Sequence, residues 1–304
     1  MPRPTDLTPP RTDAEVPGYL SALGLPGLAD LHVHVHPERL MRRIWAYFDE
    51  GERHYGVAWP IHYRLPDDER FAVLRALGVH RVPALTYAHR PGMAAALNDW
   101  CGELARERPE VLRCATLYPD EGMAEQLRVA VDEGLALVKV HCVVSDVAPD
   151  DPRLGPSLEL LAAARVPVVM HAGHGPRAGR FTGVEGVRRM LGEHPDLTLV
   201  VAHMGMPDYD AFANLVEAHE RVHLDTTMVG TEFMERLAPV PPRFLGRLRE
   251  LRSRVVLGSD FPNIPYPYAH QLEALHRWGL GEEWLRDVLW HNGRRLLDGR
   301  VTPT

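Results

Sequence analysis

The sequence predicts a (β/α)8 barrel, and three observations support this fold. Eight short apolar runs recur along the chain, amphipathic segments separate them, and the alternation continues over about 270 residues. The runs are mostly continuously apolar, as in parallel strands buried on both faces. They are Leu28–Val35, Val79–Tyr87, Leu112–Leu117, Ala136–Val140, Val166–His171, Leu197–His203, Val222–Asp225 and Val255–Gly258.

The segments between the runs have the signals of helices. Gly78 and Gly134 can take the left-handed conformation that ends a helix, and Asp208 can cap the start of one. A doubly wound open sheet is the alternative, but no GxGxxG or phosphate-binding loop follows a strand. The expected helices are Glu69–Leu77, Ala94–Arg106, Ala124–Glu133, Ser157–Ala164, Gly186–Glu193, Tyr209–Glu220 and Phe244–Arg252, followed by Ala269–Trp278 and Glu282–Leu297.

The 304 residues are long enough for one large domain or two modest ones, and the repeat favours one. We expect an irregular lead-in over residues 1–26 and a single barrel domain over residues 27–304. Residues 37–68 interrupt the repeat after the first strand and are rich in aromatic side chains. This insertion is either a lid or pocket wall, or a surface element with a small core of its own.

Composition excludes several classes of protein. The net charge of −7 disfavours a nucleic-acid binder, which needs a basic face. No apolar run approaches the ~18 residues of a membrane-spanning helix, and the first residues do not resemble a signal peptide. The three cysteines form no CxxC pair, which argues against a disulfide scaffold and favours a cytoplasmic location. The expected partner is a small-molecule substrate.

Several of the 17 histidines fall at strand ends, beginning with the first strand. His32 and His34 are two residues apart on a strand, so their side chains share one face. Two imidazoles placed in this way form half of a site for a divalent transition metal. His36 has the same parity, and we expect it to line the mouth of the pocket.

Polar residues also end the fourth, fifth, sixth and eighth strands. Lys139, His171 and His203 are spaced 32 residues apart, which places them at equivalent positions on successive strands. Asp260 follows the eighth strand and faces the same cavity, and His141 is either pocket lining or a core histidine. Burying so many ionisable groups is costly unless they are paired or bind a metal.

These residues carry a family resemblance that spans about residues 27 to 298. The chain resembles the amidohydrolase superfamily, specifically its amidohydrolase-2 branch. The matching motifs are Asp30-x-His32-x-His34-x-x-Pro37, His171, His203-Met204-Gly205, Gly258-Ser259-Asp260-Phe261-Pro262 and the closing segment His291–Leu297.

The resemblance implies a metal-dependent barrel enzyme. It assigns one metal, most often zinc, to the ligands His32, His34, His171 and Asp260. His203 would stand beside the metal-bound water as an acid or base. A bound zinc lowers the pKa of its water towards about 7. Asp260 can then take the proton and return it to the leaving group, while His203 orients the water or stabilises an oxyanion.

Lys139 leaves the number of metals open. In two-metal members of the superfamily a carboxylated lysine on the fourth strand bridges both ions, and His171 and His203 would then bind the second. The alternative is an unmodified lysine that pairs with Asp260 or with a substrate carboxylate. Because the branch usually holds one metal, we expect one zinc, with manganese or a second metal as the alternatives.

The loop after the fifth strand contains candidate substrate-binding residues. Arginine binds carboxylates through two parallel hydrogen bonds, so Arg177 and Arg180, with His174, can hold an anionic group. The alternative is that these side chains are simply solvated. His141 and His36 complete the predicted substrate-binding set.

The expected reaction is hydrolysis of a C–N or C–O bond in a small amide, ester or lactone, with a carboxylate as a candidate recognition group. Non-oxidative decarboxylation of an aromatic or unsaturated acid is the alternative, because it uses the same ligands. A TatD-type deoxyribonuclease would have a glutamate in place of Lys139, and no Gly-x-Ser-x-Gly elbow supports serine catalysis. An inactive metal-binding barrel is disfavoured by the intact ligand set. Barrels of this branch are often homodimers.

Overall fold

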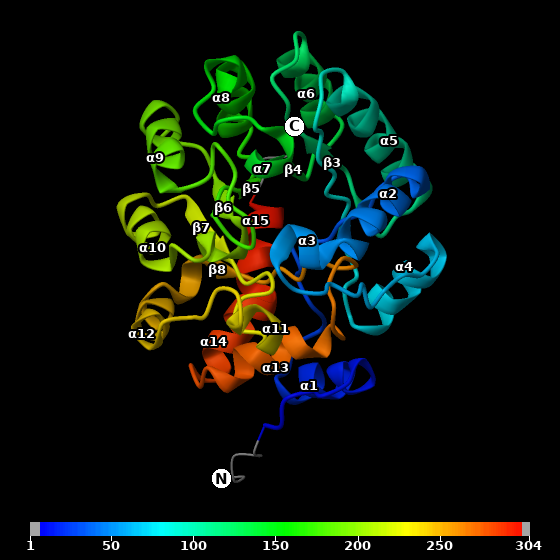
Figure 1. The fold of residues 1–304 in the computed structure, drawn as a ribbon, viewed down its shortest axis with the longest axis vertical. Helices are drawn as coiled ribbons and strands as arrows, with labels where there is room; N and C mark the ends of the chain where they lie inside the picture. The colour runs from blue at the N-terminus through cyan, green and yellow to red at the C-terminus, as the bar shows by residue number, and fades with distance from the viewer. Residues whose placement is uncertain (1–6, 300–304) are drawn as a thin grey trace.

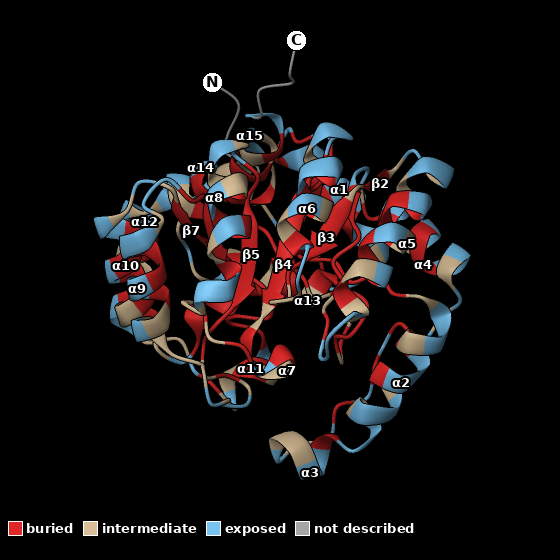
Figure 2. Cartoon of the chain, turned by 90° about the horizontal axis from the view of Figure 1, so that it is seen from above, coloured by how far each residue is buried: buried red, intermediate tan, exposed pale blue. Residues whose placement is uncertain are grey.

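Parallel strands form the centre of the molecule in the computed structural model, which describes residues 7–299 (Figure 1). Six of them pair side by side in chain order, and every neighbouring pair is parallel. They are β3 (Cys114–Thr116), β4 (Leu137–His141), β5 (Val168–His171), β6 (Leu199–Val201), β7 (Val222–Asp225) and β8 (Val255–Val256). Their residues are almost all buried, as expected for strands covered on both faces (Figure 2).

The first two expected strands close the ring, but they are less regular than predicted. In the segment 28–35, Leu28, Val33 and His34 make only isolated parallel bridges. The segment 79–87 contains only the short strand β1 (Val82–Pro83), which pairs with β2 (Val111–Leu112). Hydrogen bonds from Leu31 N to Leu257 O (2.9 Å) and from His34 N to Phe261 O (2.8 Å) join the first segment to the eighth strand. The fold is therefore a (β/α)8 barrel, as predicted.

Two local features explain this irregular seam. Pro83 has no N–H group to donate to a neighbouring strand. The N–H of His32 donates to the Asp30 carboxylate (3.0 Å), a side chain of its own segment. The sequence pattern identified the two apolar runs correctly. It could not show that some of their N–H groups do not bond to a neighbouring strand.

Helices surround the barrel, and their ends lie within two residues of the predicted ends. The surrounding helices are α4 (Asp67–Ala76), α5 (Met93–Glu107), α6 (Met123–Asp132), α8 (Gly155–Ala163), α9 (Val184–Glu193), α10 (Tyr209–Ala218) and α12 (Pro242–Glu250). Short helices α7 (Cys142–Ser145) and α11 (Glu232–Glu235) follow β4 and β7. No helix in the described part of the chain is long and apolar enough to span a membrane.

The C-terminal segment covers one end of the barrel. α13 (Ala269–Arg277) matches its prediction, but the expected helix Glu282–Leu297 is divided into α14 (Glu282–Arg286), a π-helical turn and α15 (Asn292–Asp298). Within the π-helical turn, the carbonyls of Val288 and Leu289 accept hydrogen bonds from the barrel residues Leu257 and Ala29. The regular α-helix is interrupted at the point where these two carbonyls bond to the barrel.

The lead-in over residues 1–26 is not irregular throughout, which corrects the prediction. Residues 1–6 lie outside the described residues. Further along the lead-in, a short 3-10 turn precedes the helix α1 (Val16–Ala22). Val16, Tyr19 and Leu20 are buried, and this i, i+3, i+4 spacing was the helical signal that the prediction missed. Residues 300–304 of the expected domain also lie outside the described residues.

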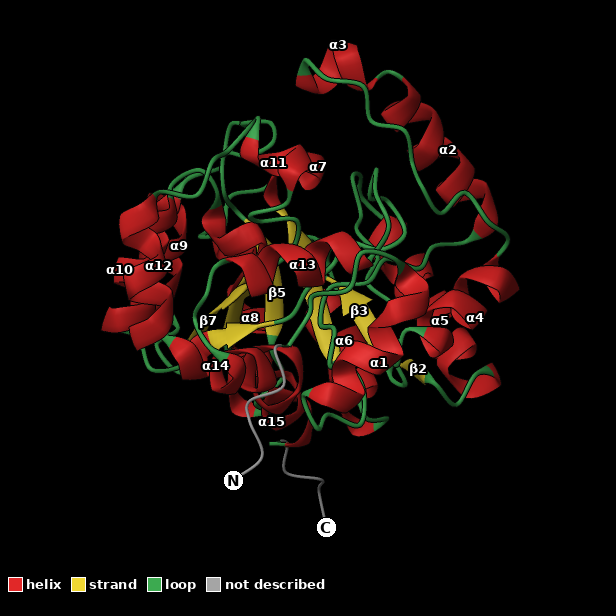
Figure 3. Ribbon diagram, turned by 90° about the horizontal axis from the view of Figure 1, so that it is seen from below, coloured by secondary structure: helices red, strands yellow, loops and turns green. Residues whose placement is uncertain are grey.

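The insertion over residues 37–68 begins with two helices, α2 (Glu38–Asp49) and α3 (Gly51–Tyr55). They extend from the body of the barrel at the end where α7 and α11 also lie, opposite α15 (Figure 3). Because the strands point their carboxyl ends towards α7 and α11, the insertion stands on the side of the barrel where sites are built.

Candidate active site and metal centre

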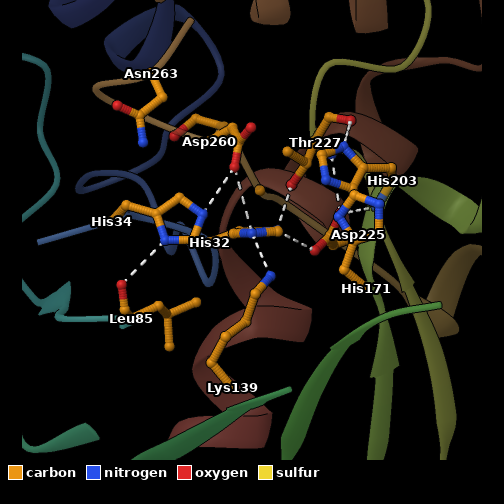
Figure 4. Close-up of polar contacts among 12 residues, drawn as sticks. His32, His34, Leu85, Lys139, His171, His203, Asp225, Thr227, Asp260 and Asn263 are labelled. Carbon is orange, nitrogen blue, oxygen red and sulfur yellow. Dashed lines mark hydrogen bonds and ion pairs between the residues drawn. The ribbon is translucent and has the colours of Figure 1, made fainter. Parts of the chain in front are cut away.

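Three side chains from the seam of the barrel converge on one point (Figure 4). The Nε2 atom of His34 lies 3.0 Å from Oδ1 of Asp260, and Nε2 of His32 lies 3.4 Å from the same oxygen. One ligand atom from each residue falls within 4.8 Å of the others. Asp260 has a φ of +69°, and its N–H donates to the His32 carbonyl (2.9 Å), which ties the turn after β8 to the first segment.

Hydrogen bonds orient both imidazole rings. The Nδ1 atom of His34 donates to the Leu85 carbonyl (3.0 Å), which leaves the lone pair on Nε2 free. The Nδ1 atom of His32 lies 2.8 Å from Oδ2 of Asp225, which orients its Nε2 in the same way. Histidines that bind metals typically donate their other nitrogen to a carboxylate or carbonyl. Two such nitrogens and a carboxylate oxygen therefore fit a divalent transition metal.

Asp225 is a candidate site residue that the sequence pattern did not identify. Besides holding His32, its carboxylate accepts hydrogen bonds from the N–H groups of His203 (2.7 Å) and Thr227 (3.1 Å). It ends β7, just as His171 ends β5, so the rule of polar residues at strand ends would have found it.

His171 and His203 lie at the edge of this cluster. Their ring centroids are 4.6 Å apart, and the His203 ring is 5.3 Å from that of His32. His203 Nδ1 donates to the Thr227 carbonyl (3.1 Å), which leaves its Nε2 free. His171 Nε2 donates to the Gly175 carbonyl (3.0 Å), so only its Nδ1 can bind a metal. The structure brings both residues to the site, and their assigned roles remain predictions.

Lys139 reaches into the cluster from β4 and is completely buried. Its Nζ lies 2.7 Å from Nε2 of His32, the same nitrogen that a metal would bind. Burial lowers the pKa of Lys139 to about 8, although the nearby charges of Asp260 and Asp225 oppose this change. Lys139 therefore belongs to the site, in a position that affects metal binding directly.

The protonation states match those of metal ligands, which must be deprotonated. Burial, followed by the charge of Lys139, lowers the pKa of His32 to about 3. Burial alone would raise the pKa of Asp260, but the neighbouring rings of His34, His32 and His203 hold this pKa well below its usual range. In the same way, burial is outweighed at Asp225, where the His32 ring lowers the pKa to about 2.

The cluster lies in a cavity with about 460 Å³ of space not filled by atoms, including its open mouth. The insertion supplies Phe48, Tyr55 and Trp59 to this cavity, so residues 37–68 form a wall of the pocket. Ligand pockets are typically mostly apolar with a few convergent polar groups. The remaining lining residues are His32, His34, Tyr87, Lys139, His141, His171, Pro176, His203, Met228, Asp260 and Asn263.

Two further predicted substrate-binding residues lie close to the cluster. His141 lines the pocket and stacks on His171, with ring centroids 4.2 Å apart. His36 does not line the mouth of the pocket, in contrast to the prediction. It is fully buried behind the lining residues, where it stacks on His34 at 5.7 Å and meets Tyr87 edge-on at 4.9 Å.

The loop after β5 does not bring its predicted residues to the pocket lining. The His174 ring pairs with Asp208, and Arg177 donates to the Tyr47 hydroxyl (2.9 Å). Arg180 is exposed, and its guanidinium lies over the ring of the neighbouring Phe181. The substrate-binding role of these three residues stays a prediction, and it would require the loop to move.

A (β/α)8 barrel with two histidines and an aspartate converging at the carboxyl ends of its strands defines a metal-dependent barrel enzyme. The family model described as Amidohydrolase matches residues 29–299, so the chain belongs to the amidohydrolase-2 family, whose members are metal-dependent hydrolases or decarboxylases. The resemblance inferred from the sequence is thereby confirmed. No curated protein matched the chain significantly.

Solved structures of the same fold are distant in sequence. An uncharacterised TIM-barrel protein from Bordetella bronchiseptica is 19% identical, with a TM-score of 0.69 over 88% of this chain and 99% of that chain. A probable 2-pyrone-4,6-dicarboxylic acid hydrolase from Acinetobacter baumannii is 15% identical (TM-score 0.60, 88% and 98%). A 5-carboxyvanillate decarboxylase from Novosphingobium aromaticivorans, in complex with manganese, is also 15% identical (0.59, 88% and 96%). These similarities establish the fold alone.

Proposed function

We propose that the protein is a hydrolase that uses one divalent metal, zinc in the first instance, to cleave a C–N or C–O bond of a small amide, ester or lactone. The observation that carries the proposal is the convergence of His32, His34 and Asp260, with both ring nitrogens oriented by hydrogen bonds. A divalent metal held there supplies Lewis acidity and lowers the pKa of a bound water.

The surrounding residues have separate roles in this proposal. His171 is the fourth ligand, through its free Nδ1 atom. His203 presents its free Nε2 to the cavity, where it holds the attacking water or accepts a proton from it. Asp260, beside both histidines, receives a proton and returns it to the leaving group. Lys139 gives up its contact with His32 and pairs with a carboxylate of the substrate or of Asp260.

Decarboxylation of an aromatic or unsaturated acid is the second candidate, and the composition of the pocket favours it. Four aromatic side chains line the cavity, enough to enclose a planar ring. Among the described lining residues Lys139 is the one aliphatic or guanidinium cation, so a substrate with a single carboxylate fits better than one with several. The three cysteines are buried and form no disulfide with one another, which supports our proposal of a cytoplasmic location.

Two measurements test the proposal. Metal content per chain is determined for the wild type, His32→Ala and the control His223→Gln, a buried histidine of β7 that does not contact the cluster. We expect about one metal in the wild type and control and none in His32→Ala. A panel of lactones, amides and aromatic acids is then assayed with zinc and manganese while carbon dioxide is monitored.

The outcomes separate the candidates. Metal-dependent turnover of lactones or amides without release of carbon dioxide supports the hydrolase. Metal-dependent release of carbon dioxide identifies the decarboxylase instead. A metal-free wild type, or a His32→Ala variant with full metal content and activity, would refute both.

A further inference from the structure

Asn263 contributes an unused hydrogen-bond acceptor to the pocket. The residue is 2% exposed and lines the cavity beside Asp260 and His34 (Figure 4). Its side-chain oxygen is buried, and no donor among residues 7–299 reaches it. Buried polar atoms in native proteins nearly always have a partner, so this oxygen requires an explanation.

The backbone of Asn263 is fixed from two sides. Its N–H donates to the Asp260 carbonyl (2.9 Å), and its own carbonyl accepts a hydrogen bond from Nε1 of Trp59 (2.8 Å). Asp260 belongs to the metal cluster and Trp59 to the aromatic wall. Asn263 is thus held at the junction of these two parts, and its side-chain oxygen has no partner among the described residues.

Neighbouring side chains do not supply the missing donor. The Nζ of Lys139 is directed at His32, and the Nδ1 of His34 is used by the Leu85 carbonyl. The wall residue Phe48 has no polar atom. None of these groups donates to Oδ1 of Asn263, so a molecule in the pocket can supply the missing donor.

We propose that Oδ1 of Asn263 accepts a hydrogen bond from an O–H or N–H group of the substrate and thereby determines specificity. This inference deepens the proposed function and rests on it for the existence of a substrate site. The ligand class is a planar, unsaturated or aromatic compound that packs against the aromatic wall, with a donor group on the side facing Asn263. A site built to bond a substrate hydroxyl discriminates strongly against an analogue that lacks it.

Matched ligand pairs test this inference by binding, without requiring turnover. The probes are 3-hydroxybenzoate with 3-methoxybenzoate, and 4-hydroxybenzamide with 4-methoxybenzamide, titrated calorimetrically into the zinc-loaded protein. We expect the wild type to bind the hydroxyl member of at least one pair about tenfold more tightly, the typical effect of one buried hydrogen bond. Asn263→Leu, similar in size but without an acceptor, should lose this preference.

The control is Met228→Leu, which alters a pocket side chain without an N–H or O–H group and leaves the carbonyl that accepts from Thr231 in place. It should change the affinity for both members of a pair equally and keep the preference. Asn263→Ala serves as a second acceptor-free variant in case the leucine substitution impairs folding, which thermal unfolding will show.

Three results would overturn the inference: a wild type that binds neither member of any pair, a wild type that binds both members equally, or a preference that survives in the acceptor-free variants. The proposed function fails separately, if the zinc-loaded wild type binds with the expected preference but turns over no compound of the substrate panel.

Discussion

Hydrogen bonds fix the side chains at the floor of the pocket, whereas ring contacts hold most of those in its wall. The floor consists of His32, His34, Lys139, His203 and Asp260, which lie on the barrel strands or just after them. The wall consists of Phe48, Tyr55 and Trp59 from the insertion. Phe48 and Tyr55 pack against Trp59, with ring centroids 5.3 and 4.9 Å apart.

Hydrogen bonds and ring contacts therefore determine different properties of the pocket. Hydrogen bonds set the direction in which a ligand nitrogen points, and metal binding depends on that direction. Ring contacts set a shape and an apolar surface and tolerate substitution more readily. We therefore expect changes in the floor to remove metal or rate, and changes in the wall to alter the choice and affinity of substrates.

The largest effect is expected at Asp260. Asp260→Ala removes a ligand of the cluster and the proposed proton carrier, so metal content should fall to near zero and kcat/KM by at least about 10³-fold. Metal analysis and steady-state kinetics measure both, with His223→Gln as the control. Retained metal together with retained rate would contradict the division between floor and wall.

His203→Ala should affect rate more than metal. Because its Nε2 is proposed to act on the attacking water, kcat should fall by about 10²–10⁴-fold while most of the metal remains. Measurements of kcat and of metal content distinguish two roles for His203. Loss of rate with metal retained supports an acid or base, whereas complete loss of metal would make His203 a ligand, as in a two-metal site.

Asp225→Asn tests whether orientation of a floor residue matters. The amide cannot hold the His32 ring as a carboxylate does, so metal affinity should fall by about 10- to 100-fold. Competition with a chelator of known affinity gives the value. Unchanged affinity would mean that the strand ends alone position His32.

Trp59→Phe is the test of the wall. It keeps an aromatic ring but removes the hydrogen bond to the Asn263 carbonyl, so KM should rise by about five- to tenfold with metal content unchanged. The matched control is Trp100→Phe, in α5 and outside the pocket lining, which should leave KM unaltered. A large loss of metal in Trp59→Phe would show that wall and floor are not separable.

Arg177→Ala should have the smallest effect. The guanidinium is exposed and bonds to the Tyr47 hydroxyl, so we expect about a twofold change in KM at most. An increase above about tenfold would instead support the prediction, made from the sequence, that Arg177 binds substrate.

The floor was largely predictable from sequence, because polar residues follow or end the apolar runs and strand parity places His32 and His34 on one face. The repeat length was less exact, because the register pairs His171 with His141 and not with Lys139. The pairing of His32 with Asp225 was not predictable, since it joins side chains 193 positions apart and depends on the curvature of the barrel. The six regularly paired strands were predicted well, but the irregular seam between the first two segments was not. Continuous apolar runs reveal strands, but they do not reveal where a side chain such as Asp30 takes an N–H from the ladder.

The wall was harder to predict, because the sequence pattern did not identify the helices α2 and α3, which hold Phe48 and Tyr55, and Trp59 lies in the loop after them. Aromatic enrichment showed that residues 37–68 had something to bury, but a surface element and a pocket wall have the same composition. The loop residues His174 and Arg177 show the opposite case: residue type suggested substrate binding, whereas Asp208 and Tyr47 engage these side chains in the structure.

The wall comes from one continuous stretch of chain that leaves the barrel after the first strand and returns at α4. Such a segment can be exchanged between related enzymes, by recombination or by design, without touching a metal ligand. The bond from Trp59 to the Asn263 carbonyl sets a condition on the exchange, because a new segment must bring its own partner for the turn after β8. Diversification of this enzyme would then proceed by paired changes in the insertion and in that turn.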